Sequence, residues 1–150
     1  MNRMIAVVLE RGRARLFDVG PEEAVELSCV HSLSTRGGRF HSDRADAPGR
    51  GEGAYHGRIR EEERRHIAAV TARLVALDHE HSLELVLAGP EDLTRALRRA
   101  LPRSLDARFI GTLHLDRKRL TPAIIRREAR RLQAEWTQSL PLVTPIRSTP

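Results

Sequence analysis

Apolar and polar positions along the first thirty residues follow the pattern of β-strands. Residues 4–9 form a continuous apolar run bounded by charge, which is typical of a strand buried on both faces of a sheet. Residues 14–19 and 25–29 contain alternating apolar positions, and Gly20-Pro21 separates the two segments. Because the connections are short, the three segments are expected to form an antiparallel meander.

The rest of the chain predicts helices that alternate with strands. An apolar stripe at three- and four-residue spacing predicts a helix from Arg58 onward. Two further stripes predict helices over 90–101 and 122–136, each with proline at its first position. Strands are expected over 83–88 and 109–115. The order β-β-β-α-β-α-β-α predicts an α/β fold, a five-stranded mixed sheet covered by helices, as in ribonuclease H-like folds.

One segment, residues 34–57, does not fit this pattern of regular elements. It holds six of the ten glycines and almost no large aliphatic side chain. This composition predicts a flexible loop rich in glycine and arginine. The length of 150 residues then fits a single domain over 1–140 that carries this loop, followed by a tail over 141–150.

The overall composition is that of a soluble globular protein, with 40% hydrophobic and 31% charged residues. No apolar run approaches the roughly 20 residues that span a bilayer, so no membrane partner is predicted. The single cysteine, Cys29, excludes an internal disulfide and a four-cysteine zinc site, and fits a reducing cytoplasm. Cys29 and Trp136 both fall on apolar faces of their elements and are expected in the core.

Charge changes the picture more than composition does. Lysine and arginine total 26 against 20 acids, for a net charge of +6, and every cation except Lys118 is arginine. Residues 117–131 carry seven cations against Glu128 alone, and residues 36–60 carry six arginines against three acids. Two basic stretches in one small domain indicate a polyanionic partner such as RNA. A solvated surface or an arginine-rich genome would produce the same bias.

Catalytic and metal-binding patterns are absent from the sequence. Ribonuclease H chemistry requires clustered carboxylates, but the first strand has no acid before Glu10 and the fourth ends in Ala-Gly. The acids at 61–63 are explained by the dipole of a helix that begins just before them. His79 and His81, two residues apart, would point in different directions. No catalytic residue, metal site or cofactor is therefore predicted.

Two longer motifs resemble a known family. Residues 55–66 read Tyr-His-Gly-Arg-Ile-Arg-Glu-Glu-Glu-Arg-Arg-His. This stretch is similar to the segment after the Gly-Gly-Gln loop of eukaryotic and archaeal class I peptide release factors, roughly Arg-Phe-x-Arg-Leu-Arg-x-Glu-x-Arg-His. Residues 85–90, Leu-Val-Leu-Ala-Gly-Pro, resemble that family's Leu-Val-Leu-Ala-Gly strand at the expected distance. The chain thus resembles the middle domain of this superfamily, in the bacterial branch that includes relatives of Pelota and of Vms-type peptidyl-tRNA releasing proteins.

The resemblance implies a site on the ribosome but also a missing residue. In that family the middle domain enters the large subunit, and the loop glutamine helps water attack the peptidyl-tRNA ester. The corresponding tripeptide here is either Gly-Arg-Gly at 49–51 or Gly-Gly-Arg at 37–39. Arginine has no hydrogen-bond acceptor, so neither tripeptide preserves that chemistry. The family's usual N-terminal and C-terminal domains do not fit in this chain, which is either a stand-alone middle domain or a fragment.

These observations predict an RNA-binding module directed to the large ribosomal subunit or to the acceptor end of tRNA. It would act in translation termination, rescue, quality control or hibernation. Two alternatives stay open: a peptidyl-tRNA ester hydrolase with a modified loop, and a protein-interaction domain whose arginines only solubilise it. The predicted RNA contacts are glycines and arginines of the loop, the following helix and the last helix: Arg36, Gly37, Gly38, Arg39, Arg44, Gly49, Arg50, Gly51, Arg58, Arg60, Arg126, Arg127, Arg130 and Arg131.

Overall fold

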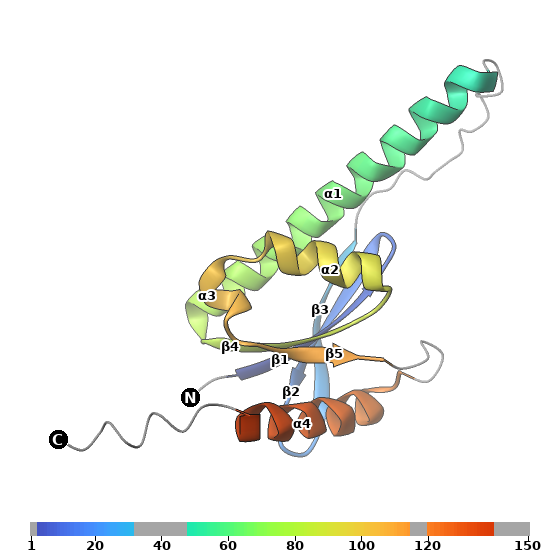
Figure 1. Cartoon of the computed structure of the whole chain (residues 1–150). Helices are drawn as coiled ribbons and strands as arrows, with labels where there is room; N and C mark the ends of the chain where they lie inside the picture. The colour runs from blue at the N-terminus through green and yellow to red at the C-terminus, as the bar shows by residue number, and fades with distance from the viewer. Residues whose placement is uncertain (1–2, 32–47, 115–119, 140–150) are drawn as a thin grey trace.

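A five-stranded mixed sheet forms the centre of the protein, and helices lie against both of its faces (Figure 1). The computed structural model describes residues 3–31, 48–114 and 120–139, with the backbone alone for residues 48–56. The elements follow the predicted order, with one short helix added: β1 (Arg3–Glu10), β2 (Arg13–Val19), β3 (Ala24–His31), α1 (Pro48–Glu80), β4 (Leu83–Ala88), α2 (Glu91–Ala100), α3 (Arg103–Asp106), β5 (Phe109–Leu113) and α4 (Pro122–Ser139).

The strand order is β3-β2-β1-β4-β5. β1 and β2, and likewise β2 and β3, are antiparallel, whereas β1 with β4 and β4 with β5 are parallel. The antiparallel meander and the two helical crossovers are therefore those predicted from the sequence. The continuous apolar run of β1 is explained by its central position, because it is hydrogen-bonded on both sides and covered on both faces.

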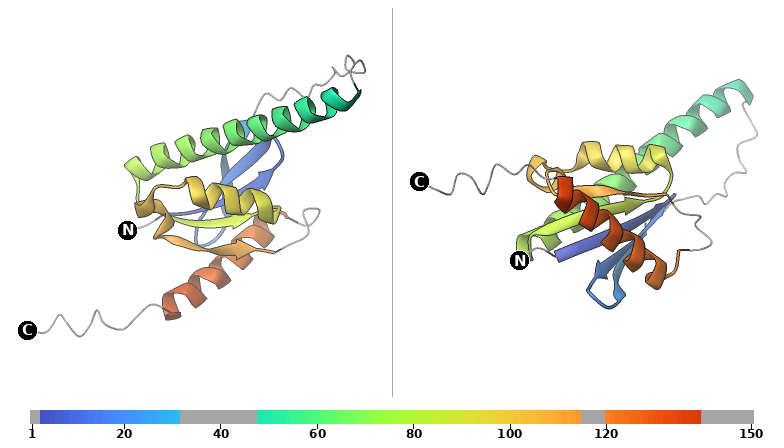
Figure 2. Two further views of the ribbon diagram at one scale, coloured as in Figure 1. Left: turned by 45° about the horizontal axis from the view of Figure 1, so that its top comes forward. Right: turned by 60° about the horizontal axis from the view of Figure 1, so that its bottom comes forward.

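Alternate residues of β1 enter two separate apolar layers. Val7 belongs to the buried cluster that includes Val70 of α1 and the apolar side chains of α2. Ala6 belongs to the cluster on the other face, together with Ile125 of α4. Figure 2 shows α1, α2 and α3 on one side of the sheet and α4 on the other. The two faces of the domain therefore present different helices to a partner.

Helix α1 begins ten residues earlier than the sequence predicts. The predicted loop over 34–57 is wrong for its last part, because residues 48–57 are helical; residues 34–47 lie outside the described residues. Pro48 suits a first helical position, since its fixed φ and missing N–H cost nothing there. Glycine costs about 1 kcal/mol per helical position, but propagation from an established helix needs no new nucleus. The acids at 61–63 consequently lie in the middle of the helix and not in its first turn.

The length of α1 sets the shape of the molecule. Its 33 residues span about 50 Å, whereas the longest strands, of eight residues, span about 26 Å. The N-terminal half of the helix therefore projects beyond the sheet (Figure 1). Residues 57–60 are exposed, and Ile59, on the line of the buried stripe, is 36% exposed. A large part of α1 is thus available to a partner.

Two residues expected in the core are not there. Cys29 is exposed, because β3 is the edge strand and the face that carries Cys29 opposite Arg15 is not closed by a helix at that point. Trp136 is only half-buried and lies outside both apolar clusters. The fully buried residues of α4 are Ile125 and Ala129, in its N-terminal half. The periodic stripe of α4 therefore continues past the region that the sheet covers.

Candidate nucleic-acid interface

The outward side of α1 carries a group of exposed arginines. Arg58, Arg60, Arg64 and Arg65 are all exposed. Helical spacing places Arg58 and Arg65 opposite the stripe that contacts the sheet, whereas Arg60, seven residues before Ile67, lies beside the line of that stripe, on the half of α1 that projects beyond the sheet. Arg58 and Arg60 form no ion pair with any described residue. Arg64 and Arg65 both pair with Glu61. Such surface pairs contribute about 0–1 kcal/mol, so these guanidinium groups can exchange a carboxylate for another anion.

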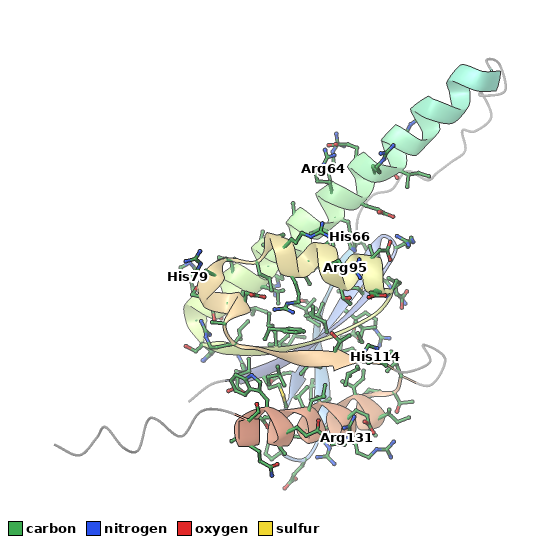
Figure 3. All side chains as sticks on the ribbon, in the orientation of Figure 1. Arg64, His66, His79, Arg95, His114 and Arg131 are labelled. Carbon is green, nitrogen blue, oxygen red and sulfur yellow. The ribbon has the colours of Figure 1, made fainter. Side chains whose placement is uncertain are left out.

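A second group of arginines lies on α2 and α3, which sequence reasoning missed. Arg99 and Arg103 are exposed and form no ion pair within the described part of the chain. Arg95 is exposed and pairs with Glu91 at 2.6 Å. Figure 3 shows Arg64 on α1 and Arg95 on α2, on the same side of the sheet. The signal was present in the sequence, because the segment 93–105 contains four arginines and no acid.

Arg98 has a structural role within this second group. Its guanidinium lies 4.0 Å from the centroid of the Phe109 ring, and it forms an ion pair with Asp106 at 3.1 Å. The stacked arginine covers the edge of the apolar cluster to which Phe109 belongs. Arg98 therefore supports the surface on which Arg99 and Arg103 lie, and it is less available to an external anion.

An arginine in the turn between β1 and β2 contacts both arginine-bearing helices. Arg11, in this turn, forms ion pairs with Glu63 of α1 at 2.5 Å and with Asp92 of α2 at 2.9 Å. The hydrogen bond to Asp92 raises the pKa of Arg11, and the same contact lowers the pKa of Asp92. One exposed arginine therefore contacts both helices, while the placement of α1 beside α2 rests on the apolar cluster that both helices enter.

A buried histidine lies beneath the same turn. His66 of α1 is 2% exposed, and neither of its ring nitrogens has a hydrogen-bond partner among the described residues (Figure 3). Burial lowers the pKa of His66. Backbone groups of Arg13 and Glu10 and the carboxylate of Glu63 oppose this shift, and His31 adds to it. The neutral imidazole is thus the form that the fold accommodates.

We expect the protein to lose stability as the pH falls below about 6.5, the ordinary pKa of histidine. Below that value the unfolded chain binds a proton at His66 that the folded chain does not bind, so unfolding becomes more favourable until the lowered folded-state pKa is reached. The slope is at most about 1.4 kcal/mol per pH unit. Urea unfolding of wild type and of His66→Leu between pH 7.5 and 5.5 measures it. His66→Leu should be at least as stable as the wild type at pH 7.5, and its free energy of unfolding should not decrease with falling pH through this histidine. Equal pH dependence of the free energy of unfolding in the two proteins would contradict a role for His66.

Two arginines of α4 point partly into the domain. Arg126 is half-buried and donates to the backbone carbonyl of Pro21 at 3.1 Å. Arg130 is half-buried and donates to Gln133 at 2.8 Å, and Gln133 donates in turn to Glu84 of β4 at 2.9 Å. These side chains therefore attach α4 to the sheet.

The other two arginines of α4 are exposed but paired. Arg127 and Arg131 both contact Glu128, and Arg131 also pairs with Glu135 at 2.9 Å. The contact with Glu128 raises the pKa of Arg131. Figure 3 shows Arg131 and Arg64 on opposite sides of the sheet. The structure therefore does not bring the arginines of α4 and α1 together on one surface.

Eight of the predicted contacts precede residue 58. Three of them, Gly49, Arg50 and Gly51, are in the first turn of α1, so the tripeptide at 49–51 is helical and not part of a loop. The others lie outside the described residues: Arg36, Gly37, Gly38, Arg39 and Arg44.

The described residues hold no group of three or more histidine, cysteine, aspartate or glutamate side chains that could bind a metal ion. Cys29 and His31 come together in a pair, with 3.4 Å between Sγ and Nε2. None of the helices in the described part of the chain is long and apolar enough to cross a membrane.

Comparison with known proteins gives one family and several similar structures. The family described as bacterial archaeo-eukaryotic release factor family 10 matches residues 1–133. An archaeal translation termination factor, aRF1, is 13% identical with a TM-score of 0.49, over 91% of this chain and 40% of that one. The Pelota protein of Thermoplasma acidophilum is 16% identical with a TM-score of 0.47, over 82% of this chain and 31% of that one. The chain thus spans less than half the length of these proteins. No curated protein is significantly similar to it in sequence.

Proposed function

Since the chain belongs to the bacterial archaeo-eukaryotic release factor family 10, we propose that this release-factor-like module binds RNA on the large ribosomal subunit or at the acceptor end of tRNA. Its action there belongs to translation termination, rescue, quality control or hibernation. The observation that carries the proposal is the arginine surface of α1, α2 and α3. It comprises six exposed arginines: Arg58, Arg60, Arg64, Arg65, Arg99 and Arg103.

The chemistry of this surface suits phosphate groups. Guanidinium groups are planar forks that bind phosphate oxygens in pairs and stay charged at any physiological pH. Arg58 and Arg65 are seven residues apart on one helix, which corresponds to about 10 Å along its axis. Four of the six form no ion pair with a described residue, so binding an RNA phosphate there breaks no ion pair within the described part of the chain. The surface is therefore ready to bind a polyanion.

The projection of α1 supports a recessed binding site. A helix with its side chains is about 10–12 Å wide, much narrower than the whole domain. The half of α1 beyond the sheet carries Arg58 and Arg60 and can enter an RNA-lined cavity that excludes the sheet. A Cβ added at Gly57 would meet no atom within 4 Å. RNA backbone can therefore approach the helix closely at this position.

Charge reversal on α1 tests the proposal. We expect Arg58→Glu with Arg60→Glu to weaken binding to large ribosomal subunits or tRNA by about tenfold or more, because two phosphate contacts become repulsive. Both side chains are exposed, so the fold should persist. Binding is measured by co-sedimentation with ribosomes and by fluorescence anisotropy with labelled tRNA.

The matched comparison is Arg127→Glu with Arg131→Glu, which changes the net charge by the same amount on the other face. These arginines are already paired with Glu128 and Glu135, so we expect a smaller loss. An equal loss in both variants would show that net charge alone governs binding. A larger loss for the α4 variant would move the interface to that helix.

We also expect no intrinsic release of peptide from peptidyl-tRNA. The only glutamines of the sequence are Gln133 and Gln138, both on α4, and Gln133 is engaged with Glu84. α4 lies on the face of the sheet opposite α1 (Figure 2). Ribosomes carrying labelled peptidyl-tRNA should therefore retain the label on incubation with the protein. The variant Arg39→Gln converts residues 37–39 to Gly-Gly-Gln, whereas Arg50→Gln gives only Gly-Gln-Gly within α1. Release by the wild type above background would favour the hydrolase alternative.

A further inference from the structure

The sheet is open at β3. This strand pairs with β2 on one side and has no other strand beside it among the described residues. An edge strand presents a row of backbone N–H and C=O groups that another extended segment can pair with. Figure 2 shows the β2–β3 hairpin at the margin of the sheet.

The exposed side chains of β3 are unusually apolar. Val25 is 49% exposed and Leu27 is 38% exposed, and Ile59 is the only other large apolar residue with comparable exposure in the described ranges. Edge strands are commonly protected by lysine, proline or a β-bulge. β3 contains no lysine or proline, and its pairing with β2 has one bulge, at Leu27 between Glu26 and Ser28. An open edge with apolar side chains is the geometry of strand addition, in which a peptide extends the sheet.

The charge of this edge is opposite to that of the rest of the protein. Residues 16–30 contain four acids and no lysine, arginine or histidine, although the whole chain carries +6. Two of these acids, Asp18 and Glu26, form ion pairs with arginines of β1 and β2. Glu22 and Glu23 are exposed and form no ion pair with any residue that the structure describes. The carboxylates without an ion pair among the described residues therefore lie at the β2–β3 turn, near the guanidinium that Arg126 places on the Pro21 carbonyl.

A shallow open groove connects the turn to the strand. The backbone N–H of Gly20 donates to the carbonyl of Glu23 at 2.8 Å, which closes the turn. Arg126 of α4 holds the carbonyl of Pro21 from the other side. The groove is thus held in place by hydrogen bonds before any partner binds. It is lined by Asp18, Gly20, Pro21, Glu22, Glu23 and Val25.

We propose that the open edge of β3 binds an extended basic peptide segment of a partner protein. The peptide backbone pairs with β3, its cationic side chains face Glu22 and Glu23, and its apolar side chains cover Val25 and Leu27. A second copy of this chain is a poor occupant, because its β3 contains no arginine or lysine to face Glu22 and Glu23. RNA is repelled by the same acids. The surface is thus separate from the arginine surface of α1, and it does not depend on the function proposed for that surface.

The test uses the whole chain and a fluorescent peptide of about eight residues in which arginine alternates with valine. We expect saturable binding by anisotropy, and none for the matched glutamate–valine peptide. Glu22→Arg with Glu23→Arg should weaken binding on the order of tenfold, the effect of losing two surface ion pairs and gaining repulsion. The matched control is Glu80→Arg with Glu91→Arg, which changes the net charge equally on exposed helical positions and should retain most of the affinity.

Amide hydrogen exchange on the wild type provides a second measurement that needs no variant. Bound peptide should slow exchange of the β3 amides that do not pair with β2, and should leave the α1 amides unchanged. Equal loss of affinity in the two charge variants, or protection that spares β3, would overturn the proposal. A dimer seen by sedimentation that dissociates in Val25→Ser with Leu27→Ser would assign the edge to a second copy and would overturn it as well.

Discussion

Replacing Gly89 with alanine is expected to destabilise the protein by about 3–5 kcal/mol, the range reached only by severe single substitutions. Gly89 has φ = +137°, a backbone conformation that residues with a Cβ rarely adopt. A Cβ at this position would lie 2.5 Å from the backbone oxygen of Leu9 and 3.0 Å from its Cβ. The unfavourable φ and the steric clash with Leu9 both destabilise the variant. The clash cannot be relieved easily, because it involves backbone atoms of the central strand, which cannot move without disturbing the sheet.

Gly89 also determines where α2 begins. β4 ends at Ala88, and the backbone carbonyl of Pro90 accepts the first hydrogen bonds of α2, from Leu93 and Thr94 at 3.0 Å. A distorted position 89 would therefore displace the helix that carries Arg95 and Arg99. Loss of stability and loss of RNA binding should appear together in this variant.

Gly12→Ala is the matched control for Gly89→Ala. Gly12 also has a positive φ, +79°, but a Cβ there would meet no atom within 4 Å. Its replacement should cost only the conformational preference, about 1 kcal/mol. Chemical denaturation of the two variants measures the difference. Equal destabilisation would show that the contact with Leu9 contributes nothing.

The strands and crossovers could be predicted from the sequence because each has a clear local pattern. The continuous apolar run of β1 reflects burial of both of its faces. The apolar alternation in β2 reflects burial that alternates along much of the strand. The family also could be inferred from the sequence, because residues 55–66 and 85–90 keep the spacing of two release-factor motifs. The match of residues 1–133 to family 10 confirms that resemblance.

The errors arose where tertiary structure decides the outcome. A two-residue alternation in β3 indicates a strand but does not tell whether a helix covers it, so the pattern predicts Cys29 in the core although it is exposed. The pairing of β3 with β2 also shifts register between Leu16 and Phe17, which no local pattern reveals. The glycines at 49 and 51 predict a loop, but α1 continues through them. Local propensity is too weak to end an established helix.

The candidate site was predicted only in part, for a related reason. Clustered arginines identify basic segments of the sequence. They do not tell which guanidinium groups form ion pairs or hydrogen bonds within the protein. On α4, Glu128 and Glu135 lie at the helical spacing that allows pairing with Arg131. Arg126 donates to the backbone carbonyl of Pro21 in the turn between β2 and β3. On α2 and α3 the arginines are more dispersed in sequence, and the fold places them beside α1. The spacing of acids and arginines along α4 predicts their pairing. The placement of the α2 and α3 arginines beside α1, in contrast, requires knowledge of the sheet topology.

Binding of the protein to ribosomes or tRNA is expected to fall by about 10³-fold between about 50 and 200 mM salt. The six arginines chosen above for this surface (Arg58, Arg60, Arg64, Arg65, Arg99 and Arg103) would each neutralise one phosphate and release condensed counterions. The slope of log affinity against log salt should then be about −4 to −5. Arg58→Glu with Arg60→Glu should reduce the magnitude of this slope by about two, because each phosphate contact contributes about one.

The slope distinguishes the RNA-binding function from its alternatives better than a single affinity does. Net charge alone would give weak binding with similar slopes in the α1 and α4 variants, since both remove the same charge. A phosphate-binding surface on α1 predicts instead a larger change for the α1 variant at the same net charge. Arg99→Glu with Arg103→Glu extends the measurement to α2 and α3, whose arginines should contribute a further change of about two. A slope near zero in the wild type, or no binding at the lowest salt concentration, would favour the protein-interaction alternative, because an interface that releases no counterions is insensitive to salt.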